Sequence, residues 1–335
     1  GYDNYAQWSL QKSVAKTPQT VMNFFEKLLK PTFEKVAKEV AFLKDFSGKD
    51  QIAPHNWDYY AEKVRKAQYD LDENQLKPYF ELFNVLEKGV FHAATELYGI
   101  TFKRRMDLPV YHPDVVVYEL FEADGSPLGL YYGDFYTREN KRGGAWMSEL
   151  VTPSKLFGQK PVIYNVCNYT PPTQALPCLL SFSEVETLFH EFGHALHAFF
   201  AEQQYATLAG TAVARDFVEF PSQFNEYWAL HPEVLPHYAR HYLSQEVITP
   251  SLIEKLKASR DFNRGYAFCE VLASAYLDMQ WHTLPASAQV TEVAAFENEA
   301  IKRFPKEVPV RYSISLISLV GAMPQAIMHI SIQRY

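Results

Sequence analysis

Cysteine is scarce in this chain of 335 residues, which contains only Cys167, Cys178 and Cys269. Their spacing matches no zinc-finger pattern, so we expect buried free thiols. Free thiols are consistent with a reducing compartment, and a cytoplasmic location is therefore expected. The chain begins at Gly1 rather than at methionine and shows no signal peptide. We expect it to be a fragment whose true N-terminus is missing, which leaves a periplasmic location open.

Basic residues are outnumbered, with 32 Lys and Arg against 39 Asp and Glu and a net charge of −7. Because the chain also lacks a dense basic stripe, we expect no nucleic-acid partner. Its apolar run before Pro324 is too short to span a membrane, so no membrane partner is expected either. Internal repeats and low-complexity segments are absent. With 47% hydrophobic residues, the chain can bury a large core in one big domain or two lobes, and we expect a monomer.

The residues that are present include a metal-binding pattern. Residues 190–194 read His-Glu-Phe-Gly-His, and such a pattern lets one helix supply two zinc ligands and a general base. Positions four apart lie on one helix face, so His190 and His194 can share one ion. Glu191 stands beside the first ligand, where its carboxylate can reach the attacking water.

The helix that carries this pattern has a start signal of its own. Ser183 and Glu186 fit a capping box, with Ser183 as the N-cap. A buried helix is expected, because apolar residues surround the motif: Leu188, Phe189, Phe192, Ala195, Leu196, Phe199 and Phe200. With 11 histidines, the bare motif arises by chance in roughly a few per cent of such chains. The alternative is a core helix whose histidines are merely hydrogen-bonded.

A catalytic zinc normally has three protein ligands and one open position, so a third ligand is needed. The run from Arg215 to Trp228 predicts a second helix, broken or kinked near Pro221. Asp216 and Glu219 are three apart and share one face of it. Glu219 is the better third ligand, and Asp216 is a candidate acceptor for a ligand imidazole N–H. Without the first helix, such an acidic pair is more often a solvated surface.

These motifs resemble those of the thimet oligopeptidase family of zinc peptidases. The resemblance covers most of the chain up to about Tyr312, and within the family it favours the bacterial peptidyl-dipeptidase branch over oligopeptidase A. It is carried by several segments: 141–146, 161–168, HEFGHALH at 190–197, 205–211, RDFVEFPSQ at 215–223, and 224–228.

The resemblance implies a mainly α protein with a small β-sheet, namely a zincin-like (gluzincin) catalytic domain truncated at both ends. It implies one Zn²⁺ held by His190, His194 and Glu219, with Glu191 as base, which agrees with the spacing argument. Such a chain would hydrolyse short peptides and release C-terminal dipeptides. Three alternatives stay open: an endo-acting oligopeptidase of the same family, a zinc-binding but catalytically impaired fragment, and a structural helical protein.

Residues 1–100 are interpreted as the helical part of the peptidase domain. Apolar periodicity predicts three helical stretches there: one that opens at Thr17 and Pro18 and is divided at Pro31, one over Trp57–Tyr69 capped by Asn56, and one from about Gln75 to Tyr98 that stops at Gly99.

Residues 101–312 are interpreted as the catalytic region, which begins with a small sheet. Strands are predicted at 115–121 and 129–132, joined by a turn at 123–126, and again at 161–168. An exposed edge strand can hold an extended peptide by main-chain hydrogen bonds, although the chain's own loops can equally cover such an edge. The resemblance favours substrate binding near Gly144 and Ala145 and at Tyr164 to Asn168, including Asn165.

Helices follow again, at about 261–281 and 290–304. His231, His237 and His241 form a second histidine cluster, but no acidic residue lies at ligand spacing, so a second metal site is disfavoured.

Residues 313–335 depart from the resemblance and are interpreted as an atypical apolar tail. The family has a loop here whose His and Tyr side chains bind substrate and the oxyanion. One choice of codons for residues 322–330, read two bases later, encodes Tyr-Ala-Ala-Gly-Tyr-Tyr-Ala-Tyr, which is that loop. The tail is therefore a possible frameshift product. Losing an oxyanion donor costs about 10²–10³ in turnover, so we expect a chain that binds zinc yet cleaves slowly.

Overall fold

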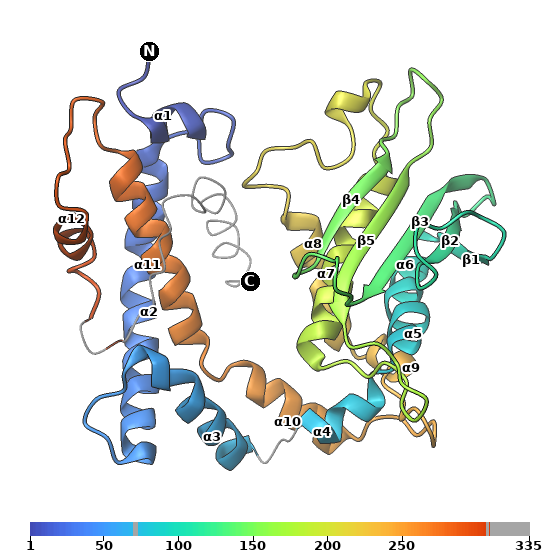
Figure 1. The fold of residues 1–335 in the computed structure, drawn as a ribbon, viewed down its shortest axis with the longest axis horizontal. Coiled ribbons are helices and arrows are strands. Elements are labelled where there is room, and N and C mark those ends of the chain that lie inside the picture. Colours follow the sequence, from blue (N-terminus) through green and yellow to red (C-terminus); the bar gives the residue numbers. More distant parts are fainter. Residues whose placement is uncertain (70–72, 306–307, 309–335) are drawn as a thin grey trace. The chain divides into compact units, whose positions relative to one another are not determined.

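The chain packs around two separate cores in this computed structural model, which describes residues 1–69, 73–305 and 308 (Figure 1). The first unit takes the described residues of 1–71, 214–217 and 253–335, and the second takes those of 72–213 and 218–252. The functional boundaries expected at 100 and 312 stay predictions. The predicted tail at 313–335 lies outside the described residues.

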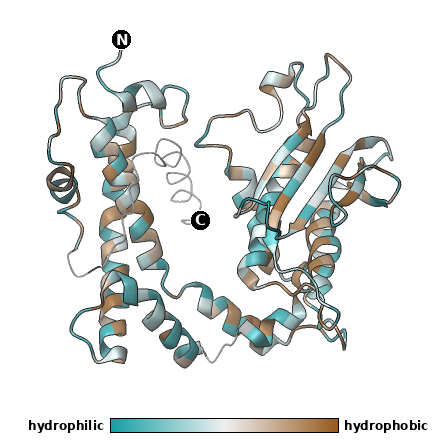
Figure 2. Cartoon of the chain, viewed as in Figure 1, coloured by the Kyte–Doolittle hydropathy of each residue, from teal (hydrophilic) through white to brown (hydrophobic). Residues whose placement is uncertain are grey.

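The first unit is helical. It contains α1 (Tyr5–Leu10), α2 (Pro18–Ser47), α3 (Trp57–Tyr69), the larger part of α10 (Pro250–Arg260), α11 (Arg264–His282) and α12 (Val293–Ala300). Hydrophobic and hydrophilic residues alternate along α2 and α11 (Figure 2). Their apolar faces pack together with α3, where the Trp57 ring stacks on Tyr266 at 3.8 Å between centroids. The predicted bounds of α3 are confirmed, whereas α11 and α12 are shorter than predicted.

Pro31 does not divide α2, which contradicts the prediction. A proline inside a helix costs roughly 3 kcal/mol, because it removes one backbone hydrogen bond and crowds the preceding turn. Here the buried stripe continues on both sides of Pro31, with Leu28 before it and Val36 after it in the same core. Burial of that stripe outweighs the local cost, and the helix runs on.

The second unit combines a sheet with short helices. Its helical segments are α4 (Glu73–Leu76), α5 (Leu82–Val85), the π-type turn η3 (Leu86–Val90), α6 (Phe91–Tyr98), α7 (Phe182–Phe199), α8 (Phe220–Glu226) and α9 (Leu235–Tyr238), with 3-10 turns η2 (Lys77–Tyr79), η4 (Ala206–Leu208) and η5 (Tyr227–Leu230).

The single helix predicted from Gln75 to Tyr98 is therefore broken into pieces. The break comes where the chain pairs with a distant segment, since Leu82 N–H donates to the Cys178 carbonyl at 3.0 Å and Leu180 N–H to the Phe80 carbonyl at 2.8 Å. Such long-range pairing is invisible to a helical periodicity. The predicted stop at Gly99 is confirmed, with φ at 72°.

The sheet has five strands in the order β1-β2-β3-β5-β4: β1 (Thr101–Arg105), β2 (Val116–Phe121), β3 (Pro127–Tyr136), β4 (Trp146–Val151) and β5 (Val162–Tyr169). Only β3 and β5 pair in parallel. The predicted hairpin and the strand at 161–168 are confirmed as β2–β3 and β5. The prediction did not include β4, which forms one edge of the sheet beside β5.

The core of this unit lies between the sheet and α7 (Figure 1). Phe192 of α7 meets Tyr131 of β3 at 5.3 Å and Phe91 of α6 at 5.4 Å between ring centroids. The three cysteines of the chain are buried free thiols, as predicted. None of the helices in the described residues combines the length and apolar composition that crossing a membrane requires.

Candidate metal centre

Helix α7 carries the predicted metal motif, but its first turn differs from the prediction. Ser181 rather than Ser183 is the N-cap, and Glu184 rather than Glu186 completes the capping box. The Ser181 hydroxyl accepts from Glu184 N–H at 3.3 Å, and the Glu184 carboxylate accepts from Ser181 N–H at 2.7 Å. Because two Ser-x-x-Glu patterns overlap here, sequence alone does not separate them.

The predicted ligands lie together. Nε2 of His190 is 3.1 Å and Nε2 of His194 is 3.0 Å from the same oxygen of Glu219, Oε2. Their ligand atoms all lie within 4.8 Å of one another, and in the described part of the chain no other three His, Cys, Asp or Glu residues are grouped in this way. All three side chains are mostly buried.

Gly193 is what lets Glu219 come so close. A Cβ at Gly193 would lie 2.6 Å from Ser222 Cα, so α7 and α8 approach each other there without a side chain between them. The Asn225 amide also donates to the Phe189 carbonyl at 2.6 Å, which ties the two helices together. Sequence analysis missed this role, although a glycine between two ligand histidines is a usable signal for close helix packing.

The second helix begins later than predicted. Residues 215–219 form turns, and α8 starts at Phe220 with Pro221 in its first turn. A proline suits that position because the first backbone N–H groups of a helix have no intrahelical acceptor. Glu219 therefore lies just ahead of the helix as its N-cap, rather than on a helical face shared with Asp216.

Glu226 supports His190 in the way that was predicted for Asp216. Its Oε1 lies 2.6 Å from His190 Nδ1, which leaves Nε2 for a metal ion. The carboxylate of Asp216 instead accepts from the backbone N–H groups of Val14 and Ala15, at 2.8 and 3.0 Å. Sequence analysis missed Glu226, because its place opposite His190 depends on how α8 packs on α7.

The carboxylates dominate the electrostatics of the site. Burial lowers the pKa of His190, but its hydrogen bonds to Glu219 and Glu226 outweigh this and raise that pKa to about 10. Burial also raises the pKa of Glu219, and the two imidazoles hold it far below its ordinary value. The proton on His190 neutralises part of the negative charge of the carboxylates. A bound divalent cation can replace that proton as the neutralising charge.

Glu191 lies next to the ligands with one oxygen unused. It is 6% exposed, and its Oε2 has no hydrogen-bond partner among the described residues. Burial raises its pKa, which the two histidines partly oppose. Asn165 of β5 donates to the Glu191 backbone carbonyl at 2.9 Å. Asn165 was predicted to bind substrate, but it is fully buried and holds the backbone of the metal helix instead.

The other predicted substrate residues lie at the edge of the sheet. Gly144 and Ala145 lead directly into the edge strand β4, and Asn168 of β5 donates to the carbonyls of Arg142 and Gly144 at 2.8 and 2.7 Å. Tyr164 and Asn165 belong to β5, which is flanked by β3 and β4 and offers no free edge.

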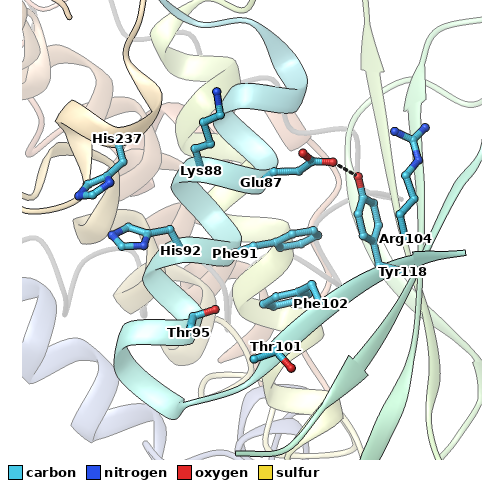
Figure 3. Close-up of a pocket in the computed structure, with 10 residues that line it drawn as sticks. All are labelled: Glu87, Lys88, Phe91, His92, Thr95, Thr101, Phe102, Arg104, Tyr118 and His237. Carbon is cyan, nitrogen blue, oxygen red and sulfur yellow. Dashed lines mark hydrogen bonds between the residues drawn. The ribbon is translucent and has the colours of Figure 1, made fainter. Parts of the chain in front are cut away.

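A separate cavity of about 570 Å³ lies between the η3–α6 segment and strands β1 and β2 (Figure 3). His237, from the predicted second histidine cluster, reaches this cavity and packs against His92 at 4.1 Å between ring centroids, with the rings tilted. Tyr118 donates to Glu87 there at 2.5 Å. His241 instead contacts the rings of Tyr79 and Tyr242. None of the residues that line the cavity is a candidate metal ligand of the α7–α8 site.

Comparison with known proteins agrees with the motif. The family model for Peptidase family M3 matches residues 1–326. Dipeptidyl carboxypeptidase of Salmonella typhimurium is 49% identical over 305 residues, and its Escherichia coli counterpart is 48% identical. Each match covers 90% of this chain and 45% of the relative. Oligopeptidase A of Escherichia coli is 38% identical over 84% of this chain and 42% of its own length.

The chain thus spans about half the length of the curated relatives it matches. The family match is far longer than the metal motif and includes the sheet, α7, α8 and the helices on either side. This chain belongs to peptidase family M3.

Proposed function

We propose that this chain is the catalytic part of a zinc peptidase that hydrolyses short peptides and releases C-terminal dipeptides. One observation carries the proposal: two imidazole nitrogens and one carboxylate oxygen converge, with the carboxylate of Glu191 buried beside them. The family membership supports the same chemistry.

The residues fit a zinc ion. Ligand atoms in a tetrahedral zinc site lie about 3.3 Å apart, since each bond is about 2.0–2.1 Å long. The contacts of 3.0 and 3.1 Å from the histidines to Glu219 are close to that value. His190, His194 and Glu219 would be the three ligands, which leaves the fourth position for water or substrate. The buried Glu191 oxygen without a partner is further support, because native proteins rarely leave such an atom unused.

A zinc ion bound there would supply Lewis acidity, which makes a water molecule more acidic and polarises a carbonyl. Glu191 would accept the proton of the attacking water and deliver it to the leaving amine. Its pKa is raised by burial, which favours that exchange by bringing the carboxyl closer to working pH. Glu226 would keep His190 in the tautomer and orientation that present Nε2.

The edge strand β4 suits an extended peptide. Met147 of β4 pairs with Asn165 of β5, whose amide holds the Glu191 carbonyl. A peptide added alongside β4 would therefore run next to the catalytic helix, bound by main-chain hydrogen bonds. The exposed residues Gly143 and Gly144, just before this strand, offer main-chain groups without side chains in the way.

The release of dipeptides rests on the names of the relatives, since those at 48–49% identity are called dipeptidyl carboxypeptidases. The endo-acting alternative rests on oligopeptidase A at 38% identity. Fluorogenic peptides with a free or an amidated C-terminus would separate the two. A dipeptidyl carboxypeptidase releases dipeptides from the free form and largely spares the amide, whereas an endopeptidase cleaves both.

The test uses this chain with one equivalent of zinc and a chelator control. Chelator-sensitive cleavage supports a working peptidase. Bound zinc without cleavage of either peptide favours the impaired fragment, and the absence of zinc binding contradicts the proposal.

A further inference from the structure

The loop between β3 and β4 is anchored by a buried charged pair. The side chain of Lys141 is 3% exposed, and its ammonium donates to Asp134 Oδ1 at 2.9 Å, to the Asp134 carbonyl at 2.8 Å and to the Tyr136 carbonyl at 2.8 Å. An ammonium has three protons, so all of its donors are used. Lys141 thus holds the middle of the loop against the end of β3.

Asp134 is itself fully engaged. Its two oxygens accept from both terminal nitrogens of Arg138, at 2.7 and 2.8 Å, and Oδ2 also accepts from the Tyr111 hydroxyl at 3.0 Å. Arg138 lies at the start of the same loop, whereas Tyr111 comes from a different segment. A buried carboxylate that is held by two cations and a hydroxyl makes a segment rigid.

Asn168 fastens the far end of the loop. Both of its amide protons are used, one on the Arg142 carbonyl and one on the Gly144 carbonyl. Gly144 has a φ of 91°, a conformation that glycine adopts without strain. The N–H groups of Gly143 and Gly144 take part in no hydrogen bond among the described residues, and both glycines are exposed. The loop is fixed through its carbonyls while these main-chain donors stay free.

We infer that Lys141 and Asn168 are positioning residues that hold the Gly143–Ala145 backbone in the conformation in which it binds a peptide at the β4 edge. This rests on the proposed peptidase function. Neither side chain would touch the reacting atoms. They act by ordering a glycine-containing loop before the substrate arrives, because the entropy of ordering that loop would otherwise weaken binding.

The test measures binding apart from catalysis. A fluorescent peptide with a free C-terminus is titrated by anisotropy into zinc-loaded chain that carries Glu191→Gln, so that the peptide is not cleaved. Asn168→Ala and Lys141→Met, each added to this background, should raise Kd about tenfold, because the loop must then be ordered when the peptide binds. Tyr111→Phe is the matched control, since it removes one bond to Asp134 without touching the loop, and it should leave Kd unchanged.

Two further readouts separate positioning from general destabilisation. Amide hydrogen exchange of residues 142–146 should be faster in Asn168→Ala and Lys141→Met than in Tyr111→Phe, with the zinc content equal in all of them. In the chain that retains Glu191, both variants should raise KM while kcat stays within about threefold, because uniform binding is lost and not transition-state stabilisation.

Equal Kd values for the parent and both loop variants would overturn the inference while leaving the peptidase proposal intact. A fall in kcat at unchanged KM would also overturn it, because the residues would then act on the chemical step. If the Glu191→Gln parent binds zinc but no peptide, the proposed function itself fails, and the inference falls with it.

Discussion

Two buried charged clusters of the second unit differ in how completely their members are paired. At Asp134, both oxygens accept hydrogen bonds, and the partners Arg138 and Lys141 supply two positive charges to one carboxylate. At the candidate metal centre, Glu191 and Glu219 crowd two imidazoles, and one Glu191 oxygen has no partner among the described residues. Both clusters are largely buried, so the difference does not come from solvent.

The difference shows what each cluster is built to do. A cluster whose central carboxylate has cationic partners and hydrogen bonds on both oxygens has no further use for a ligand, and it contributes rigidity. A cluster with excess negative charge and an unused buried oxygen is costly unless a cation and a substrate complete it. The metal centre therefore has the properties of a functional site, and the Asp134 cluster those of a scaffold.

The largest expected effect comes from removing the Glu191 carboxylate of the candidate metal centre, whose Oε2 has no partner among the described residues. Glu191→Gln should lower kcat by about 10²–10⁴, because an amide cannot accept the proton of water. Zinc content, measured by atomic absorption, should stay at that of the parent, since Glu191 is not a ligand. Gln at this position with full activity would mean that another group is the base.

Glu226→Gln should lower the affinity for zinc rather than affect proton transfer from the attacking water. Loss of the negative charge at 2.6 Å from His190 should weaken zinc binding about 10–100-fold. Competition with a chromogenic chelator measures this, with the exposed Glu233 changed to Gln as the control. Equal zinc affinities in the two variants would show that Glu226 does not orient its histidine.

Much of the candidate metal centre could be predicted from the sequence, because most of its residues are close together along the chain. His190, His194 and Glu191 lie within one turn of a helix, and helical geometry alone brings them together. Glu219 was found because a catalytic zinc needs a third ligand and an acidic residue lies nearby in the chain. The hairpin β2–β3 and helix α3 were likewise confirmed, since turn residues and apolar periodicity mark both.

The remaining features depend on contacts between distant segments. Glu226 faces His190 only because Gly193 lets α8 pack closely on α7, and Asn165 reaches the Glu191 carbonyl because β5 packs against α7. The break near Glu81 needs a partner a hundred residues away, at Leu179. In α2, by contrast, burial overrides a local signal for a break. The hydrophobic periodicity of the sequence does not predict contacts between such distant segments.

The Asp134 cluster should make the stability of the protein depend on pH in the acid range. Burial raises the pKa of Asp134, but its hydrogen bonds to Arg138 and Lys141 outweigh this and bring it to about 2, below the ordinary 3.8. The lowered pKa of the Asp134 carboxylate corresponds to on the order of 2 kcal/mol of stability above about pH 4. The contribution is lost as the pH falls from about 4 towards 2, because in that range the unfolded state takes up a proton while the folded carboxylate stays ionised.

Urea unfolding of the parent and of Asp134→Asn checks this. The variant should be less stable by about 2 kcal/mol near pH 7, and the difference should shrink below about pH 4. Tyr111→Phe, which keeps the carboxylate, should retain the acid dependence of the parent. A difference that does not change with pH would mean that the lost stability comes from packing and not from charge.

The smallest expected effect concerns where the metal helix begins. Ser181→Ala should cost about 1 kcal/mol of unfolding free energy, because it removes the side chain that accepts from Glu184 N–H at the start of α7. Ser183→Ala is the matched control two residues later, within the first turn of the helix, and its cost should stay below about 0.5 kcal/mol. Zinc affinity should be unchanged in both, since the capping box lies two turns before His190. If Ser183→Ala proved the more costly of the two, the cap would lie where the sequence pattern first suggested, and α7 would begin two residues later.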